Sequence, residues 1–447
     1  MTDSNGCPGS LAVSNPGPAA SLTQLRERLV AQVLVTSGIR DERIAAALRD
    51  VPRHLFLPHL PPEEAYLDEA IVTKRDAEGQ PISSSSQPAI MAIMLDQLDL
   101  APGCRVLEIG AGTGYNAALI RHIVGPSGAV VSVDIEADLV EGARDHLASA
   151  GYPDVTVVAA DGAEGYPPGA PYDRVIATVG VSDLAPAWLH QASPGARIVV
   201  PLDVRGSQLA VAFGRAGGGG HWVSRSIAPC GFMRMRGSLA GPERIVVLQP
   251  GLCVMLPDGL TLADGQEVDG AALAAFLDEP PTAFATGVRT SSPQVFWGLG
   301  LWLAAGDRRS CGVAWEWPAS PSGPADGTAA ARLARAPLRV RGMLATAGIV
   351  DSGGIAVLTT DRAITAVDSR PGQFALEVAG FGPHGSQLGA ALTAHAQAWD
   401  RAGQPGADRL HVDAFPRSSS DEPAPSSPAG DALLIERPAT RFIVYHT

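Results

Sequence analysis

No stretch of eighteen consecutive apolar residues occurs in the sequence, so we expect no membrane-spanning helix. The opening stretch "MTDSNGCPGSLAVSNPGPAASL" lacks the basic start and apolar run of a secretory signal, and we interpret residues 1–20 as a disordered lead-in. Cysteine is scarce, with five scattered residues and no C-x-x-C pair. We therefore expect neither a disulfide framework nor a metal site, and this cysteine usage fits a reducing cytoplasm.

Clustered positive charge is also missing. The net charge is −13 and no basic block offsets it, which argues against nucleic acid as a partner. Any anionic substrate must therefore be held by local donors. Hydrophobic residues make up 46% of the 447 residues, which is enough for the cores of two or three domains.

Helical and strand patterns alternate in the first half of the chain. Residues 21–50 and 88–98 have helical character. From "CRVLEIG" onward, near-continuous apolar strand runs alternate with helical stretches. Strands of this kind are buried on both faces, as in a parallel sheet covered by helices. We predict an α/β domain with a doubly wound sheet over residues 21–240.

Residues 241–447 have a different texture, with short β-like runs and many glycines. One clear helix, "SQLGAALTAHAQAWDRAG", lies between the strand runs "FALEVAGFG" and "RLHVDAFP". We predict an additional C-terminal α+β domain over residues 241–447. Two low-complexity segments are predicted to be mobile loops or linkers, "PASPSGPADGTAAARLARAP" and "PRSSSDEPAPSSPAGD".

A glycine loop stands between a predicted strand and a predicted helix in "VLEIGAGTGYN". Glycines let a backbone approach a ligand closely, and a helix N-terminus adds partial positive charge. The dinucleotide fingerprint G-x-G-x-x-G would need glycine where Tyr115 stands, which disfavours a nicotinamide oxidoreductase. The observed G-x-G-x-G with an acid two residues earlier resembles the S-adenosylmethionine (SAM) site of Rossmann-like methyltransferases. The candidate cofactor residues here are Glu108, Gly110, Ala111, Gly112, Thr113 and Gly114.

Two further strand ends carry acids. Asp134 ends the next strand, where a carboxylate can accept hydrogen bonds from ribose hydroxyls, and Ile135 follows it. An acid at a strand end is, however, more often a helix cap. Asp161 and Gly162 end the third strand, where the resemblance to methyltransferases places the adenine. The alternative for the whole set is a structural strand-turn-helix without a ligand.

The resemblance becomes specific in the segments "GIRDERIAAALRDVPRHLFLP", "QPISSSSQPAIMAIML", "VLEIGAGTGYNAALI" and "PGARIVVPL". Their order and texture resemble protein-L-isoaspartate O-methyltransferases over about residues 22–237. The resemblance implies a Rossmann-like fold, SAM as methyl donor and a peptide carboxylate as acceptor. An acidic residue in the loop would then suit the ammonium group of SAM.

The sequence departs from this family at its "GQTIS" hallmark, whose serine is implicated in catalysis. Pro81 replaces the threonine, and further serines follow Ile82. Among the candidates Ser83, Ser84 and Ser86, the "SQP" context favours Ser86 and suggests that Gln87 contacts substrate. The alternative is a flexible serine-rich loop that ends in a helix cap. This departure disfavours repair of isoaspartate.

Other segments resemble a longer form of the family, found with ribosomally made, modified peptides such as lanthipeptides, lasso peptides and graspetides. The segment "CGFMRMRG" and the added C-terminal half carry this likeness. Arg234 and Arg236 alternate there, so we expect them on one side of a strand, either against acidic peptide groups or on a solvated edge. Thr178 and Val179 follow a buried strand at the ligand-binding edge and are expected to contact substrate.

These residues predict an enzyme that aligns a carboxylate with an activated methyl group. A carboxylate is already ionised at neutral pH, so no strong base is needed. The leading hypothesis is methylation of an aspartate in a modified precursor peptide, after which the ester closes to an aspartimide and may open to isoaspartate. The alternatives are repair of isoaspartyl proteins and a non-catalytic peptide-binding module.

Overall fold

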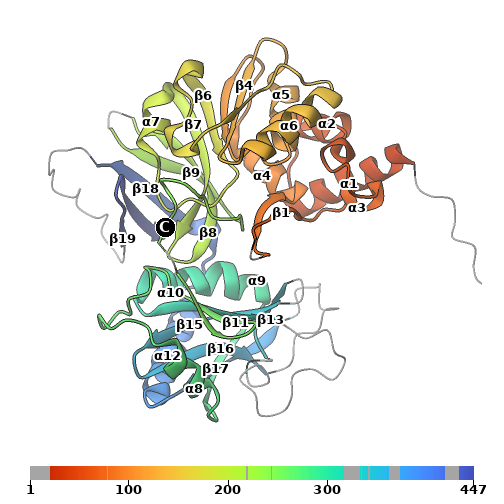
Figure 1. Ribbon diagram of the computed structural model, residues 1–447. Coiled ribbons are helices and arrows are strands. Elements are labelled where there is room, and N and C mark those ends of the chain that lie inside the picture. The colour runs from red at the N-terminus through yellow and green to blue at the C-terminus, as the bar shows by residue number, and fades with distance from the viewer. Residues whose placement is uncertain are drawn as a thin grey trace, which may run out of the picture.

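Two lobes make up the molecule, each built on its own large sheet (Figure 1). The computed structural model describes residues 21–446 except 78, 218–219, 243, 317–332, 334, 341–342, 362–372 and 418–431. The lead-in predicted for residues 1–20 and almost all of the two low-complexity segments lie outside the described residues.

The chain enters the first lobe through helices. Ser21 and Asp41 cap the first two by accepting hydrogen bonds from backbone N–H groups in the first turn. A short hairpin then leads into a helix that begins at a proline. The helices predicted within residues 21–50 and 88–98 are confirmed. The elements are α1 (Leu22–Ser37), α2 (Glu42–Asp50), η1 (Arg53–Phe56), α3 (Pro62–Ala65), β1 (Ile71–Arg75), β2 (Pro81–Ser85) and α4 (Pro88–Leu98).

The predicted doubly wound sheet is confirmed. Its parallel part has the order β5-β4-β3-β6-β7, so the chain reverses its winding direction between β3 and β6. Hydrophobic cores cover both faces, one formed with α1, α2, α4, α5 and α6, the other with α7. The elements are β3 (Arg105–Ile109), α5 (Tyr115–Val124), β4 (Ala129–Asp134), α6 (Ala137–Ser149), β5 (Thr156–Ala159), η2 (Gly162–Glu164), η3 (Pro167–Gly169), β6 (Tyr172–Ala177), α7 (Pro186–Gln191) and β7 (Ala192–Val204).

Antiparallel strands extend this sheet, and three of them come from the end of the chain. The order continues β7-β8-β9-β18-β20-β19. The division predicted at residue 240 therefore differs from the sheet connectivity, because the strands β18, β19 and β20 return to the first lobe. Apolar side chains such as Phe442 and Val444 explain the return, since they are buried with Trp222 in one core. The elements are β8 (Ser207–Arg215), β9 (Trp222–Pro229), η5 (Ala407–Arg409), β18 (Leu410–Pro416), β19 (Leu433–Glu436) and β20 (Thr440–His446).

The second lobe is an antiparallel sheet with helices, as the predicted α+β class requires. The strand order is β10-β11-β13-β15-β16-β17-β12, and β14 pairs with β15. The predicted late helix is confirmed as α12. The elements are β10 (Ile245–Gln249), β11 (Leu252–Met255), α8 (Gly270–Leu277), β12 (Thr282–Thr290), α9 (Ser292–Gln294), η4 (Val295–Leu299), α10 (Gly300–Gly306), β13 (Ser310–Glu316), β14 (Leu338–Val340), β15 (Met343–Asp351), β16 (Gly354–Thr360), β17 (Phe374–Phe381) and α12 (Gly385–Arg401).

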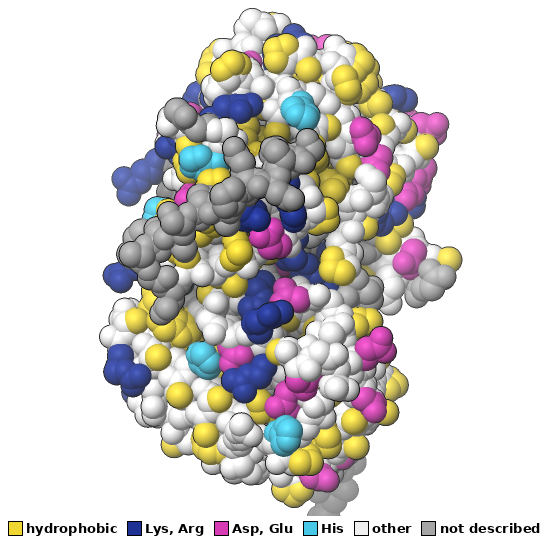
Figure 2. All heavy atoms as spheres, turned by 90° about the vertical axis from the view of Figure 1, so that its left-hand side faces the viewer, with side chains coloured by type: hydrophobic (Ala, Val, Ile, Leu, Met, Phe, Trp, Pro, Cys, Tyr) yellow, Lys and Arg dark blue, Asp and Glu magenta, His cyan; other side chains and the backbone are white. Residues whose placement is uncertain are grey.

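Charged side chains join the two lobes where they meet, and Figure 2 shows both signs gathered at this waist. Arg205, in the turn between β7 and β8, is buried against the second lobe. Its guanidinium donates to the carbonyl oxygens of Ala304 (2.6 Å) and Arg308 (3.1 Å) and pairs with Asp258 at 2.9 Å. A buried arginine that reaches several acceptors ties the lobes at a defined point.

Candidate active site

An open cavity, with about 900 Å³ of empty space that includes solvent at its mouth, lies at the carboxyl ends of β3, β4 and β6, where the sheet reverses its winding. Ligands of doubly wound sheets bind at such a switch point. Three segments line most of it: the glycine loop after β3, the serines of the β1–β2 hairpin, and the segment 232–236. The structure thus brings together most of the residues singled out from the sequence, Ser83, Ser84, Ser86, Gly110, Ala111, Gly112, Thr113, Asp134, Ile135, Gly162, Thr178, Val179, Arg234 and Arg236.

The glycine loop needs its glycines for two reasons. Gly110, Gly112 and Gly114 all have positive φ, at 100°, 51° and 86°. A Cβ on Gly110 would also lie 2.6 Å from Oγ1 of Thr178. That hydroxyl donates to the carbonyl oxygen of Gly110 at 2.7 Å. Thr178 therefore lines the cavity and at the same time holds the loop in place.

Glu108 lies behind the cavity and does not belong to its lining. Its fully buried carboxylate accepts hydrogen bonds from Ser132 Oγ (2.5 Å) and Asn116 Nδ2 (2.7 Å). Burial raises the pKa of Glu108 to about 7, against the lowering effect of these two donors. Asn116, which sequence reasoning missed, does line the cavity. The sequence signal that could have identified Asn116 is its position in the first turn of the helix that follows the glycine loop, one residue after Tyr115.

The carboxylate of Asp134 faces both the cavity and the loop. It accepts hydrogen bonds from the backbone N–H groups of Gly112 (2.9 Å) and Glu136 (3.2 Å). The helix-cap alternative does not hold, because the N-cap position of α6 is Glu136. Beside Asp134, Ile135 is 41% exposed and gives the cavity an apolar surface suited to a flat ring.

Asp161 has a different setting from the one expected, because the cavity lining includes Gly162 but not Asp161 itself. The Asp161 carboxylate accepts from the backbone N–H groups of Ala163 (3.0 Å) and Ser238 (2.8 Å). Burial acts to raise its pKa, but these backbone donors hold the pKa of Asp161 below its ordinary value. It anchors the end of the "CGFMRMRG" segment next to the cavity.

The serines lie on a strand. Ser83, Ser84 and Ser85 belong to β2, which pairs with β1, so the alternative of a flexible loop is wrong. The helix-cap part is also wrong, since the N-cap of α4 is Gln87 and makes no side-chain cap bond. A Cβ on Gly112 would lie 3.6 Å from the carbonyl oxygen of Ser84, so strand and glycine loop face each other closely.

Two serine hydroxyls differ in their surroundings. Ser83 Oγ accepts from Thr73 Oγ1 at 3.1 Å. Ser85, which sequence reasoning left out, also lines the cavity, and its buried hydroxyl has no hydrogen-bond partner among the described residues. Alternation along the strand was no guide, because four identical residues in a row give no pattern. Gln87 is directed elsewhere, since its Nε2 donates to Asp68 at 3.2 Å and it does not line the cavity.

The segment with the two arginines is extended but is not a strand, contrary to the prediction. Its only ladder contact among the described residues is an isolated bridge between Arg234 and Gly180. The arginines have different partners. Arg236 pairs with Glu136 at 2.6 Å, and Glu136 also binds Lys74 at 2.5 Å. The exposed Arg234 donates to the carbonyl of Pro242 at 2.6 Å.

No His, Cys or Lys occurs among the described residues that line the cavity. The lining therefore offers hydroxyls, backbone groups, one amide, one carboxylate and two guanidinium groups. This set can orient an acceptor that is already a nucleophile. The positive-φ cradle, the Asp134 carboxylate and the apolar Ile135 fit SAM, which supplies an activated methyl group when bound.

In the part of the chain that the structure describes, no group of three or more His, Cys, Asp or Glu side chains is arranged to hold a metal ion. None of the helices described there has both the length and the apolar character needed to cross a bilayer.

A glycine loop at the switch point of a doubly wound sheet, an acid after the neighbouring strand and an apolar wall beside it define a Rossmann-like SAM-dependent methyltransferase. The family model for protein-L-isoaspartate(D-aspartate) O-methyltransferase matches residues 24–237. The chain belongs to this family, and it is a SAM-dependent carboxyl O-methyltransferase.

Among the relatives, the protein-L-isoaspartate O-methyltransferase of Methanopyrus kandleri is 42% identical over 184 residues, which are 41% of this chain and 79% of the relative. That of Hyperthermus butylicus is 37% identical over 228 residues, 49% of this chain and 92% of the relative. A solved structure from Plasmodium falciparum, a putative enzyme of the same name in complex with S-adenosyl-L-homocysteine, is 14% identical, with a TM-score of 0.41 over 47% of this chain and 98% of that one.

Proposed function

We propose that this enzyme methylates the side-chain carboxylate of an aspartate in a ribosomally made, modified precursor peptide. The observation that carries the proposal is the serine strand, which faces the glycine loop across one cavity. Hydroxyl and backbone N–H donors orient a carboxylate without quenching it, whereas a paired Lys would bind it and weaken it as a nucleophile. Alignment of two reactants can supply about 7–11 kcal/mol of the barrier.

The product ester then reacts without help from the protein. The backbone amide nitrogen that follows the aspartate attacks the ester carbonyl, the new C–N bond closes the aspartimide ring, and methanol leaves with the amide proton. We therefore assign only methyl transfer to the cavity. Water that later opens the ring gives aspartate or isoaspartate.

The modified-peptide part of the proposal is supported by what lies outside the family match. The match ends at residue 237, and the second sheet follows. The "GQTIS" hallmark is altered at Pro81, and the segment "CGFMRMRG" resembles the longer, peptide-modifying form. We propose that the second lobe, within the predicted range 241–447, recognises the precursor peptide.

We further propose distinct substrate roles for the two arginines. The charge of Arg236 is offset by Glu136. Arg234 has no carboxylate partner among the described residues and lies at the cavity. It is therefore suited to an acidic residue of the peptide beside the one that is methylated.

Repair of isoaspartyl proteins is the second candidate, because the curated relatives at 35–42% identity bear the name protein-L-isoaspartate O-methyltransferase. The chemistry at the cavity is the same for both. The difference lies in which carboxylate reaches the serines.

Mass spectrometry of SAM-fed reactions on two peptides separates the candidates. One peptide carries an isoaspartyl residue, and the other carries installed rings and a normal aspartate. A gain of one methylene on the ring-bearing peptide, followed by loss of methanol, is the expected result. Its Asp-to-Asn version, which lacks the carboxylate, is the control and should gain nothing. A gain on the isoaspartyl peptide alone would make repair the function, and no gain on either would contradict both candidates.

A further inference from the structure

A buried arginine stands behind the serine strand. Arg53, at the start of η1, is 0% exposed. Its guanidinium donates to three backbone carbonyls: Ala65 at 2.9 Å, Ser86 at 3.2 Å and, at the limit of hydrogen bonding, Glu69 at 3.5 Å. Nη1 has no hydrogen-bond partner among the described residues. The serine segment is therefore tied to a distant part of the sequence by a charged group.

The charge of Arg53 has no ion pair among the described residues. Burial lowers the pKa of its guanidinium, while Tyr115 and then Asp68 nearby act in the opposite direction. An arginine nevertheless stays protonated in proteins, so the charge persists in the interior. Neutral donors would bind three carbonyls without the cost of burying a cation. The three hydrogen bonds therefore do not by themselves explain why a charged side chain is buried at this position.

A buried acid, Asp68, binds the same segment, where β2 leads into α4. Asp68 accepts hydrogen bonds from Gln87 Nε2 (3.2 Å) and from the backbone N–H of Ala89 (2.8 Å). Arg53 and Asp68 thus hold the junction of β2 and α4, Arg53 at the carbonyl of Ser86 and Asp68 at the N–H of Ala89 in the first turn of α4. The position of Ser86 at this junction is set by both charges.

The guanidinium also lies next to the cavity wall. Its central carbon is 4.9 Å from the centre of the Tyr115 ring, a cation–π distance. Both Tyr115 and Ser86 line the cavity. In a poorly solvated interior, a positive charge one side chain away from the cavity favours an anion bound there.

We propose that Arg53 is a positioning residue for methyl transfer, which fixes the Ser86 peptide group and supplies the positive potential that favours an anionic carboxylate acceptor. This inference rests on the proposed function only in needing a carboxylate acceptor. It holds for an aspartyl and an isoaspartyl substrate alike.

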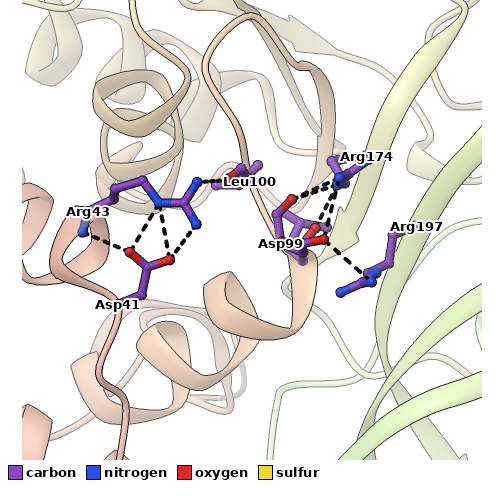
Figure 3. Close-up of polar contacts among 7 residues, drawn as sticks. Asp41, Arg43, Asp99, Leu100, Arg174 and Arg197 are labelled. Carbon is purple, nitrogen blue, oxygen red and sulfur yellow. Dashed lines mark hydrogen bonds and ion pairs between the residues drawn. The ribbon is translucent and has the colours of Figure 1, made fainter.

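The other end of α4 offers a matched control. There Arg174 donates to the carbonyl oxygens of Leu98 (2.7 Å) and Asp99 (2.8 Å), and Arg43 donates to that of Leu100 (Figure 3). Arg174 is less buried than Arg53 and also pairs with Asp99 at 3.9 Å, but like Arg53 it holds backbone carbonyls, and it lies away from the cavity lining. Arg174→Met therefore removes an arginine's carbonyl contacts at the C-terminal end of α4 without touching the serine segment that precedes its N-terminal end.

The test compares Arg53→Met, Arg53→Lys and Arg174→Met in the full chain. For each we would measure the thermal midpoint, the Kd for S-adenosyl-L-homocysteine by calorimetry, and kcat and KM with whichever peptide the wild type methylates. Arg53→Met is expected to lose about 100-fold in kcat/KM, as a misplacement of about 1 Å in a reacting group does. Its Kd should stay within about twofold. Arg53→Lys should recover about tenfold, because it keeps the charge but reaches fewer carbonyls.

Four results would overturn the proposal. Arg53→Met with kcat/KM within about threefold of wild type would reduce Arg53 to a stabilising contact, as would an equal loss in Arg174→Met. A Kd that weakens in proportion to kcat/KM would mean collapse of the whole cavity. If Arg53→Met does not fold, Arg53→Lys decides, and wild-type kcat/KM in that variant contradicts the proposal. A wild type that prefers the isoaspartyl peptide defeats the proposed substrate but leaves this comparison intact.

Discussion

The buried carboxyl of Glu108 makes a stability prediction that can be followed with pH. Its pKa is raised from 4.5 to about 7 in the folded protein, chiefly by burial. The folded state therefore keeps a proton that the unfolded chain releases above pH 4.5. The contribution of Glu108 to stability must fall as pH rises from 4.5 towards 7, since the folded state binds this extra proton in that window. A shift of this size corresponds to about 3 kcal/mol above pH 7.

Glu108→Gln removes the titrating group while keeping its shape and one acceptor oxygen for Asn116 or Ser132. The variant should therefore lose the pH dependence that Glu108 contributes. We compare the thermal midpoint of the variant with that of the wild type at each pH. For a lobe of this size, this difference should favour the variant by roughly 5–10 °C more at pH 8 than at pH 4.5. Any constant effect of the amide on hydrogen bonding cancels in this difference between two pH values.

The assay is thermal unfolding of both proteins at pH 4.5, 6 and 8, followed by circular dichroism at matched ionic strength. Gln97→Glu is not a suitable control, because it would bury a new charge against Ala210. Glu141→Gln is better, since Glu141 is exposed on α6 of the same lobe and forms no ion pair among the described residues. If Glu108→Gln and wild type differ by the same amount at all three pH values, the raised pKa of Glu108 is refuted.

Three further outcomes are expected. Ser86→Ala should lower kcat/KM for methylation by about tenfold or more with an unchanged Kd for S-adenosyl-L-homocysteine, and an unchanged rate would remove Ser86 from the chemistry. Asp134→Asn should weaken that Kd by about tenfold in calorimetry, because the charge that receives the Gly112 N–H and faces the cavity is lost. Arg205→Ala removes the donor to the carbonyl oxygens of Ala304 and Arg308 at the waist, so scanning calorimetry should show a loss of about 1–3 kcal/mol or two separated transitions, whereas a single wild-type transition would contradict the tether.

Local signals carried most of what the sequence predicted correctly. The loop at Gly110 could be predicted because closely spaced glycines indicate backbone positions with positive φ, which the structure has there. The helix α12 could be predicted because its apolar residues recur at helical spacing. These residues are buried in the structure. Both depend on residues close together in the chain.

What the sequence could not supply depends on distant partners. Ser83 to Ser85 form a strand because they pair with β1. A run of four serines contains no signal that predicts this pairing. Gln87 was assigned to substrate, but its partner Asp68 is nineteen residues away. The return of β18, β19 and β20 to the first sheet depends on pairing between β18 and β9, and the sequence pattern of a strand does not identify the strand with which it pairs. The roles proposed for the site residues stay predictions.

The return of the last strands makes the second lobe an insertion within the first rather than an appendage after it. The polypeptide crosses the waist twice, once after Pro229 and once before Leu410. The two crossings and the contacts of Arg205 therefore join the lobes at three separate places in the chain. A protein truncated at residue 240 would lack β18. The backbone N–H and C=O groups of β9 that face β18 would then have no strand to pair with. A minimal catalytic unit therefore requires an internal excision that rejoins β9 to β18 through a short linker.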